Sequence, residues 1–306
     1  MTAKAGLFLL LGAVAALFLV FWIVCERRRH TGAPTDGDRR GPLVRVLIGV
    51  VTDFFDTLGV GSFAVTTSLF KLGRITKDED IPGTLNVGHA LPTVAQAFIY
   101  IKIVNVEMTT LVAMIAASIA GAFLGAGVVV HWPRRKIQLG MGVLLLIAAA
   151  IIALRQLSLV PGGGDALGLA GGKLALALAV NFALGSLMML GIGMYAPCMI
   201  LVSLLGMNAA TAFPIMMGSC AFLMPISGVR FIRSGRYDRR AAVGLTVGGV
   251  PAVLIAAFIV HSLSLRVVQW LVVAVVVYTA AAMLKSARKP GNQHATNATA
   301  KGSTDG

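Results

Sequence analysis

The sequence TLGVGS, from Thr57 to Ser62, interrupts a long apolar stretch in the first half of the chain. The sequence MLGIGM, from Met189 to Met194, interrupts a similar stretch 132 residues later. Glycines at these positions let the backbone turn where other residues would be strained. Two glycine-broken apolar segments at matching places in two halves of a chain indicate a transporter and locate its binding site.

The composition excludes a soluble globular protein. Of the 306 residues, 57% are hydrophobic and 12% are charged, and the mean hydropathy is +0.87. Apolar runs of about 20 residues are long enough to cross a bilayer as helices, in which each backbone polar group is paired within its own segment. The chain is therefore expected to be an all-α polytopic membrane protein.

The net charge of +14 does not indicate a nucleic-acid partner. The Lys and Arg residues lie in short loops beside apolar runs, as the positive-inside rule requires of cytoplasmic loops. We expect the lipid bilayer and a small anionic solute as partners, and no nucleic acid. The sequence leaves the oligomeric state open.

Apolar runs and polar connections divide the chain into six parts. We expect an N-terminal membrane helix (5–25), a basic cytoplasmic linker (26–45), a first repeat (46–155), a Gly-rich external loop (156–172), a second repeat (173–285) and a disordered cytoplasmic tail (286–306). Each repeat contains one broken segment, 44–72 or 173–205, followed by three helices. These helices are expected at 82–101, 108–130 and 137–154, and again at 211–229, 241–260 and 267–284.

The two repeats align residue by residue as well as in hydropathy. At an offset of 132, Leu58, Gly59, Gly61, Ala64 and Pro82 coincide with Leu190, Gly191, Gly193, Ala196 and Pro214. At an offset of 131, Ala113, Ala117, Gly121 and Gly125 coincide with Gly244, Gly248, Ala252 and Ala256. Small residues at every fourth position let helix backbones approach closely in lipid.

The distribution of the 26 Lys and Arg residues favours broken segments that enter the membrane and return on the same side. Seven spans then place 21 of these residues inside and 5 outside, whereas nine spans give 18 and 8. A repeat with one re-entrant segment and three crossings has an odd number of spans, so the second copy is inverted. We predict two inverted repeats, with the N-terminus outside and the C-terminus in the cytoplasm.

A new half-helix is expected to begin after each break, from about Ser62 and about Met194. The first N–H groups of a helix lack internal partners and carry the positive end of its dipole, so they favour a small anion. The predicted substrate-binding residues are Gly59, Val60, Gly61, Ser62, Asn86, Gly191, Ile192, Gly193, Met194 and Tyr195.

Asp53 and Asp56 precede the first break and share one helix face because they are three residues apart. Carboxylates at membrane depth are costly, which makes proton coupling or cation binding the functional interpretation. They could instead brace the loop by accepting hydrogen bonds from its backbone. His89 is expected near the same cavity as a third proton-coupling residue.

The run DFFDTLGVGSFAV and the later run SGRYDRRAAVGLTVGGVPAVLIAAFIV resemble the sulfite exporter TauE/SafE family. The resemblance covers Arg45 to Leu284, and its glycine-rich breaks map onto Leu58 to Ser62 and Leu190 to Met194. It implies movement of sulfite, organosulfonates or related anions across the inner membrane of a bacterial cell, without nucleotide hydrolysis. The N-terminal helix and basic linker lie outside this resemblance.

These observations predict a secondary transporter of a small anion, moved by alternating access. A cation transporter in which Asp53 and Asp56 bind the ion is a first alternative, and a non-transporting membrane scaffold is a second. No Walker loop, H-E-x-x-H or C-x-x-C motif is present, so we expect no enzyme, cofactor or metal site.

Overall fold

The structure is a computed structural model that describes residues 3–29, 41–59, 61–77, 79–125, 164–189 and 191–261, with single positions between 139 and 157 and between 270 and 285. In this part of the chain there are ten α-helices and no strand, which confirms the all-α prediction. Among the described residues, four helical stretches are long and apolar enough to cross a bilayer: Ala3–Arg28, Gly171–Met188, Ala209–Ser234 and Arg239–Ile259. The chain is a multi-pass membrane protein.

The helices follow the expected order. They are α1 (Ala3–Arg29), α2 (Pro42–Thr57), α3 (Ser62–Gly73), α4 (Ile81–Gly88), α5 (Ala90–Ile103), α6 (Met108–Ala120), the π-helix η1 (Gly121–Gly125), α9 (Gly171–Met188), α10 (Tyr195–Leu204), the 3-10 turn η2 (Ala209–Thr211), α11 (Ala212–Ser234) and α12 (Arg239–His261). The predicted helices at 137–154 and 267–284, the linker residues 30–40 and the tail lie largely or wholly outside the described residues.

Glycines in the left-handed region make both breaks. Gly59 and Gly61 have φ values of 93° and 81°, and Gly191 has a φ of 79°. These are conformations that L-residues with a side chain rarely adopt. The new half-helices begin at Ser62 and Tyr195, within one residue of the prediction.

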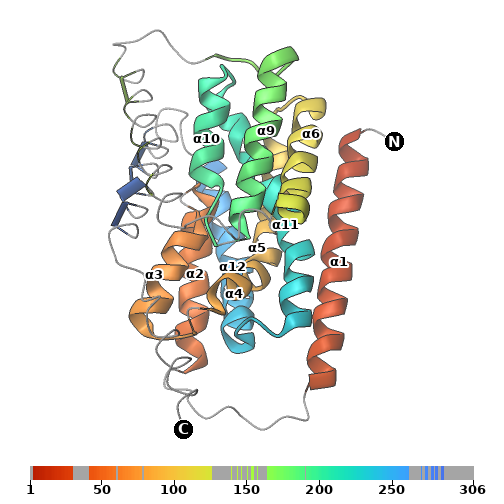
Figure 1. Ribbon diagram of the computed structural model, residues 1–306, viewed down its shortest axis with the longest axis vertical. Coiled ribbons are helices and arrows are strands. Elements are labelled where there is room, and N and C mark those ends of the chain that lie inside the picture. The colour runs from red at the N-terminus through yellow and green to blue at the C-terminus, as the bar shows by residue number, and fades with distance from the viewer. Residues whose placement is uncertain are drawn as a thin grey trace, which may run out of the picture.

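Each broken segment folds back as a hairpin. In Figure 1, α2 and α3 lie in the lower half of the molecule, and α9 and α10 lie in the upper half. At the open end of the α9–α10 hairpin, Met207 forms a backbone bridge with Ala166, just before α9 begins. The two hairpins therefore approach the middle of the molecule from opposite ends.

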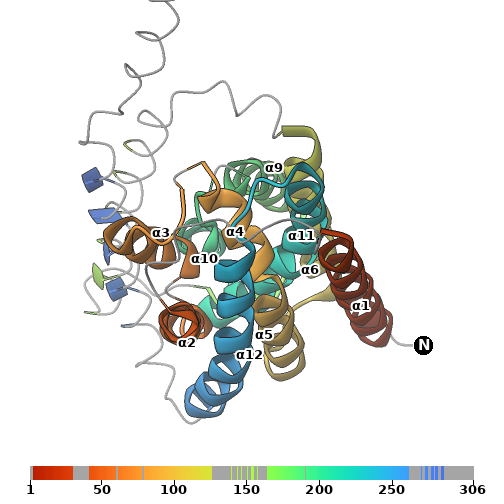
Figure 2. The same cartoon turned by 90° about the horizontal axis from the view of Figure 1, so that it is seen from below.

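Small residues join each hairpin to a helix of the other half of the chain. Helix α12 packs on α2, where a Cβ added at Gly248 would lie 2.1 Å from the backbone oxygen of Val46. Helices α6 and η1 pack on α9, where a Cβ added at Gly121 would lie 1.9 Å from the backbone oxygen of Phe182. Figure 2 shows α2 beside α12. The small-residue stripes thus form interfaces between the two halves of the chain.

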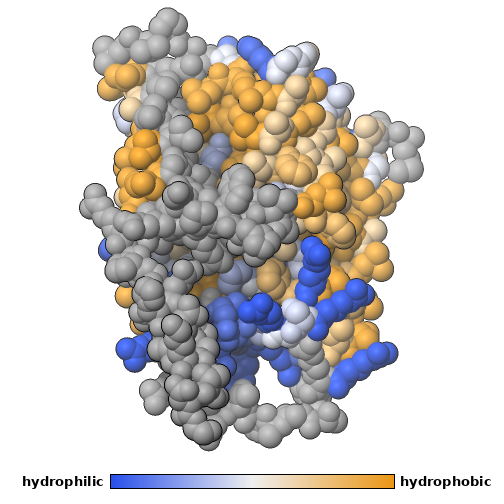
Figure 3. All heavy atoms as spheres, viewed as in Figure 1, coloured by the Kyte–Doolittle hydropathy of each residue, from blue (hydrophilic) through white to orange (hydrophobic). Residues whose placement is uncertain are grey.

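Helices α5 and α11 form the centre of the bundle. Helix α11 packs against α4, α5, α6 and α10, and almost all of its membrane-length stretch is buried. Helix α1 lies at the periphery against α11 and α5 (Figure 2). In Figure 3 the visible hydrophilic side chains gather mainly at the lower end of the described surface, and apolar side chains cover the region above them.

Candidate functional site

The tips of the two hairpins meet through equivalent contacts. A Cβ added at Gly61 would lie 3.7 Å from the Cβ of Tyr195, and one added at Gly193 would lie 3.6 Å from the Cβ of Phe63. These two contacts exchange places at the repeat offset of 132, because Gly61 corresponds to Gly193 and Phe63 to Tyr195. The structure therefore brings together the two segments that the sequence singled out.

A small cavity lies between the two tips. It is lined by Asp56, Gly61, Ser62, Phe63, Thr93, Met188, Gly193, Met194, Tyr195, Cys220 and Met224. Its volume is about 10 Å³, which is room for about one water molecule. An anion of several heavy atoms does not fit this conformation, so its admission requires the tips to separate.

Asp56 braces the first break from within the site. Its Oδ1 accepts a short hydrogen bond from the backbone N–H of Ser62, the first residue of α3, and its Oδ2 accepts one from Gln96 Nε2 at 2.9 Å. The carboxylate, which is fully buried within the protein, thus lies at the positive end of α3. The bracing interpretation of Asp56 agrees with this geometry.

Gln96 connects the two hairpins. Its Nε2 donates to Asp56 of the first hairpin, and its Oε1 accepts a hydrogen bond of 3.0 Å from the Tyr195 hydroxyl of the second. Tyr100, one turn further along α5, donates to the backbone oxygen of Thr57 at 2.7 Å. Helix α5 therefore contacts both tips through polar side chains.

Asp53 forms a separate buried pair with His89. The Nδ1 of His89 lies 2.9 Å from Asp53 Oδ1, and its Nε2 lies 3.0 Å from the Thr66 hydroxyl of α3. The pair lies beside α12, because a Cβ added at Gly249 would be 2.2 Å from Asp53 Oδ2. The sequence placed Asp53 and His89 near the cavity at the break. In the structure the two side chains contact one another, and neither is among the described residues that line the cavity.

The helix start at Tyr195 differs from that at Ser62. No acidic residue precedes it, since Met188 occupies the position equivalent to Asp56. Among the described residues the N–H groups of Tyr195 and Ala196 have no hydrogen-bond partner, and Pro197 carries no N–H. The second half-helix thus presents unpaired donors close to the cavity.

Several predicted residues lie outside the cavity wall. Asn86 donates to the backbone oxygen of Pro82 and accepts a hydrogen bond from Ser227, so it joins α4 to α11. Gly59 packs against Phe213, and Gly191 packs near Pro82. Ile192 is buried beside the break, and Val60 lies outside the described residues.

The sequence did not single out Gln96, Thr93 or Met224 as site residues. Gln96 lies seven residues after His89, hence on the same helix face, and it is a polar residue in an apolar segment. That spacing was a usable signal for Gln96. Thr93 and Met224 carry no comparable signal, because Thr and Met are ordinary residues in membrane helices.

Leucine at either tip is expected to abolish transport while the protein remains in the membrane. In Gly61→Leu the side chain would enter the cavity and the backbone would be strained at its positive φ, whereas in Gly193→Leu only the cavity would be filled. Flux by reconstituted protein, with size-exclusion profiles to confirm folding, checks both. Gly172→Ala is the control, since nothing lies within 4 Å of its added Cβ. Normal flux by Gly193→Leu would contradict a site between the tips.

A family comparison agrees with these observations. The family model of the sulfite exporter TauE/SafE matches residues 1–152 and 173–304. The chain belongs to this family, and it is a membrane transporter rather than an enzyme. Membership implies transport of sulfur anions such as sulfite. The match extends beyond Arg45 to Leu284 and includes the N-terminal helix. Comparisons with curated proteins and with solved structures found no match.

Proposed function

We propose that the chain is a secondary transporter that binds a small sulfur oxyanion, sulfite or an organosulfonate, between the starts of α3 and α10. The observation that carries this proposal is the meeting of the two tips through equivalent contacts at Gly61 and Gly193. The positive ends of two half-helices then face one small space, and an oxyanion suits that arrangement without a Lys or Arg side chain.

The packing supports two inverted repeats with re-entrant hairpins. Helix α12 of the second repeat packs on α2 of the first, and α6 of the first packs on α9 of the second. The two contacts are equivalent, because in each a later helix of one repeat packs on the first helix of the other repeat. Two repeats related by a pseudo-two-fold axis would show this pattern. The α2–α3 and α9–α10 hairpins approach the centre from opposite ends (Figure 1).

The described basic residues support the proposed orientation. Lys4 and Lys102 lie together, since Lys4 Nζ donates to the backbone oxygen of Lys102. Arg239, at the start of α12, pairs with Glu26 near the end of α1, which lies at the opposite end of that helix from Lys4. The Arg239 end carries most of the basic residues and is therefore assigned to the cytoplasm.

Asp56 determines how an anion can bind. An ionised carboxylate about 4 Å from a bound anion costs about 4 kcal/mol at an effective dielectric constant of 20. The anion and the carboxylate also compete for the same positive helix end at Ser62. Protonation of Asp56 removes the repulsion and releases the N–H group, so anion binding is coupled to proton uptake.

The Asp53 and His89 pair supplies a route for that proton. His89 contacts Asp53 through one ring nitrogen and Thr66 of α3 through the other. An imidazole with partners on both nitrogens can accept a proton at one and release it at the other. Movement of α3 away from α4 and α5 would break the Thr66 contact and expose the pair.

A change of Asp53 to Asn is expected to weaken the pH dependence of flux while anion binding persists. Asparagine retains an oxygen for the His89 Nδ1–H group but cannot form an ion pair with it. Binding titrations and initial flux rates from pH 5 to 8, about the range in which histidine titrates, measure the two effects separately. Loss of anion binding itself would favour direct cation binding by the carboxylates.

The experiment that tests the function is a flux screen with purified protein in liposomes. Sulfite, sulfate, thiosulfate and an alkylsulfonate are offered with and without a pH gradient, and Na⁺ and K⁺ are offered in parallel. We expect flux of a sulfur anion that the pH gradient stimulates. Cation flux alone would support the alternative transporter, and no flux from protein with intact folding would support a scaffold.

A further inference from the structure

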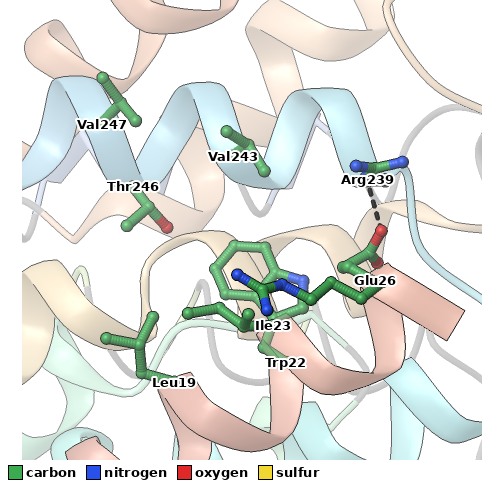
Figure 4. Close-up of a pocket in the computed structure, with 9 residues that line it drawn as sticks. Leu19, Trp22, Ile23, Glu26, Arg239, Val243, Thr246 and Val247 are labelled. Carbon is green, nitrogen blue, oxygen red and sulfur yellow. Dashed lines mark ion pairs between the residues drawn. The ribbon is translucent and has the colours of Figure 1, made fainter. Parts of the chain in front are cut away.

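A larger pocket lies outside the proposed anion site, between α1 and α12. It has a volume of about 380 Å³ and is lined by Leu19, Trp22, Ile23, Glu26, Arg27, Arg239, Val243, Thr246 and Val247. Figure 4 shows the labelled side chains of α1 facing those of α12 across this space. The volume falls within the roughly 300–1,000 Å³ typical of small-molecule pockets.

The pocket exists because α1 is attached to the bundle elsewhere. Helix α1 packs on α11 and α5, and the described residues that line the pocket come from α1 and α12. At one end the two sides are joined by the Glu26–Arg239 ion pair (Figure 4) and by the hydrogen bond from Trp22 to Tyr237. Away from this end, apolar side chains form the walls.

The walls face the lipid side of the protein. Ile23 and Val247 are 44% and 58% exposed, and other exposed apolar residues of α1 and α12 continue this surface, among them Val20, Val24, Leu254 and Phe258. In a bilayer such side chains contact acyl chains. A groove in this surface is therefore accessible to a lipid without passage through water.

The end of the pocket that carries the Glu26–Arg239 ion pair is basic. Arg27 lines it, and no hydrogen bond or ion pair is recorded for Arg27 within the described residues. The carboxylate of Glu26 is occupied by Arg239 and by the hydroxyl of Tyr237. Arg28 and Arg240 add positive charge nearby in sequence. Trp22 and Tyr237 also lie at this end, and aromatic residues of this kind are enriched at the level of lipid headgroups.

We propose that this pocket binds one anionic phospholipid, with an acyl chain along the apolar walls and the phosphate at Arg27. Basic pockets between membrane helices on the cytoplasmic side suit such headgroups. The lipid would fill the space that separates α1 from α12 and would stabilise their arrangement. The proposal rests on the pocket and on the proposed orientation of the protein, and it is independent of the proposed anion site.

The test measures the thermal stability of the full-length protein in neutral detergent as lipid is added. Phosphatidylglycerol should raise the melting temperature more than phosphatidylcholine, and native mass spectrometry should show one retained phosphatidylglycerol. Arg27→Gln should reduce the preference for the anionic lipid about fivefold, the effect of about one basic residue near a charged membrane surface. Val243→Trp should fill the groove and prevent retention of either lipid.

Arg28→Gln is the matched control, because it removes the same charge from a neighbouring residue that does not line the pocket. This variant should reduce the preference for the anionic lipid much less than Arg27→Gln does. Equal effects of Arg27→Gln and Arg28→Gln would show that anionic lipids are attracted by the overall positive charge of this end and not by a specific site at Arg27. Retention of phosphatidylglycerol by Val243→Trp, equal stabilisation by glycerol phosphate, or a dimer that Val243→Trp dissociates would each overturn the proposal.

Discussion

Asp56→Asn is expected to make anion binding independent of pH and to strengthen it under alkaline conditions. The substitution removes a carboxylate whose repulsion of a bound anion amounts to about 4 kcal/mol at about 4 Å. Complete loss of this repulsion would raise the anion affinity about a thousandfold, and we expect a rise of at least about tenfold. Asparagine still offers an oxygen to the Ser62 N–H group. Rotation of the Gln96 amide by half a turn allows it to accept from the new amide. Equilibrium binding from pH 5 to 9 measures the change.

The same variant should lose the stimulation of flux by a pH gradient, because no proton accompanies the anion. Gln96→Leu is the matched comparison, since it removes the link between the tips without removing the charge. Its binding should keep the pH dependence of the unaltered protein. An Asp56→Asn protein that binds anions with unchanged affinity and unchanged pH dependence would show that Asp56 only braces the loop.

Gly248→Ala is expected to destabilise the folded protein. Its Cβ would lie 2.1 Å from the backbone oxygen of Val46 and 2.9 Å from the backbone nitrogen of Val50, so α12 and α2 must separate. Overpacking of this kind costs about 1–3 kcal/mol, which corresponds to a fall of roughly 2–5 °C in melting temperature for a chain of this length. Gly121→Ala should act alike at the α9 interface, where the clash is with Phe182. Melting in detergent and the yield of monodisperse protein measure both.

Gly6→Ala provides the control for helical glycines, because its added Cβ would meet nothing within 4 Å. Alanine has the higher helix propensity, so this variant should be as stable as the unaltered protein or slightly more stable. A Gly248→Ala protein that melts at the same temperature as Gly6→Ala would refute the close packing of α12 on α2.

The sequence predicted the helices well because membrane segments must satisfy their backbone internally, so long apolar runs become helices. The half-helix starts followed from the glycines at 59, 61 and 191, which impose a turn locally. The approach of the two breaks followed from their equivalence in the repeats. These features depend on local chemistry or on internal repetition, both of which one sequence contains.

Hydrogen-bond and packing partners that lie far apart in the sequence could not be predicted in the same way. That Asp56 accepts from Ser62 and Gln96, whereas Asp53 contacts His89, depends on which face of α2 meets α5. The pairing of each hairpin with a helix of the other repeat is also a property of tertiary packing. The small-residue stripes predict close packing but do not identify the partner helix. Asn86 was predicted to bind substrate from its place one turn into the helix that starts near Pro82, whereas in the structure it accepts a hydrogen bond from Ser227 of α11.

Proton uptake on anion binding is the direct test of coupling through Asp56. Purified protein in weakly buffered solution is mixed with sulfite, and the pH change is followed with an indicator dye for the unaltered protein and for Asp56→Asn. The difference between them cancels the protonation of sulfite itself. We expect the unaltered protein to take up about one more proton for each bound anion than Asp56→Asn does. Equal proton uptake by the two proteins, with anion bound to both, would contradict it.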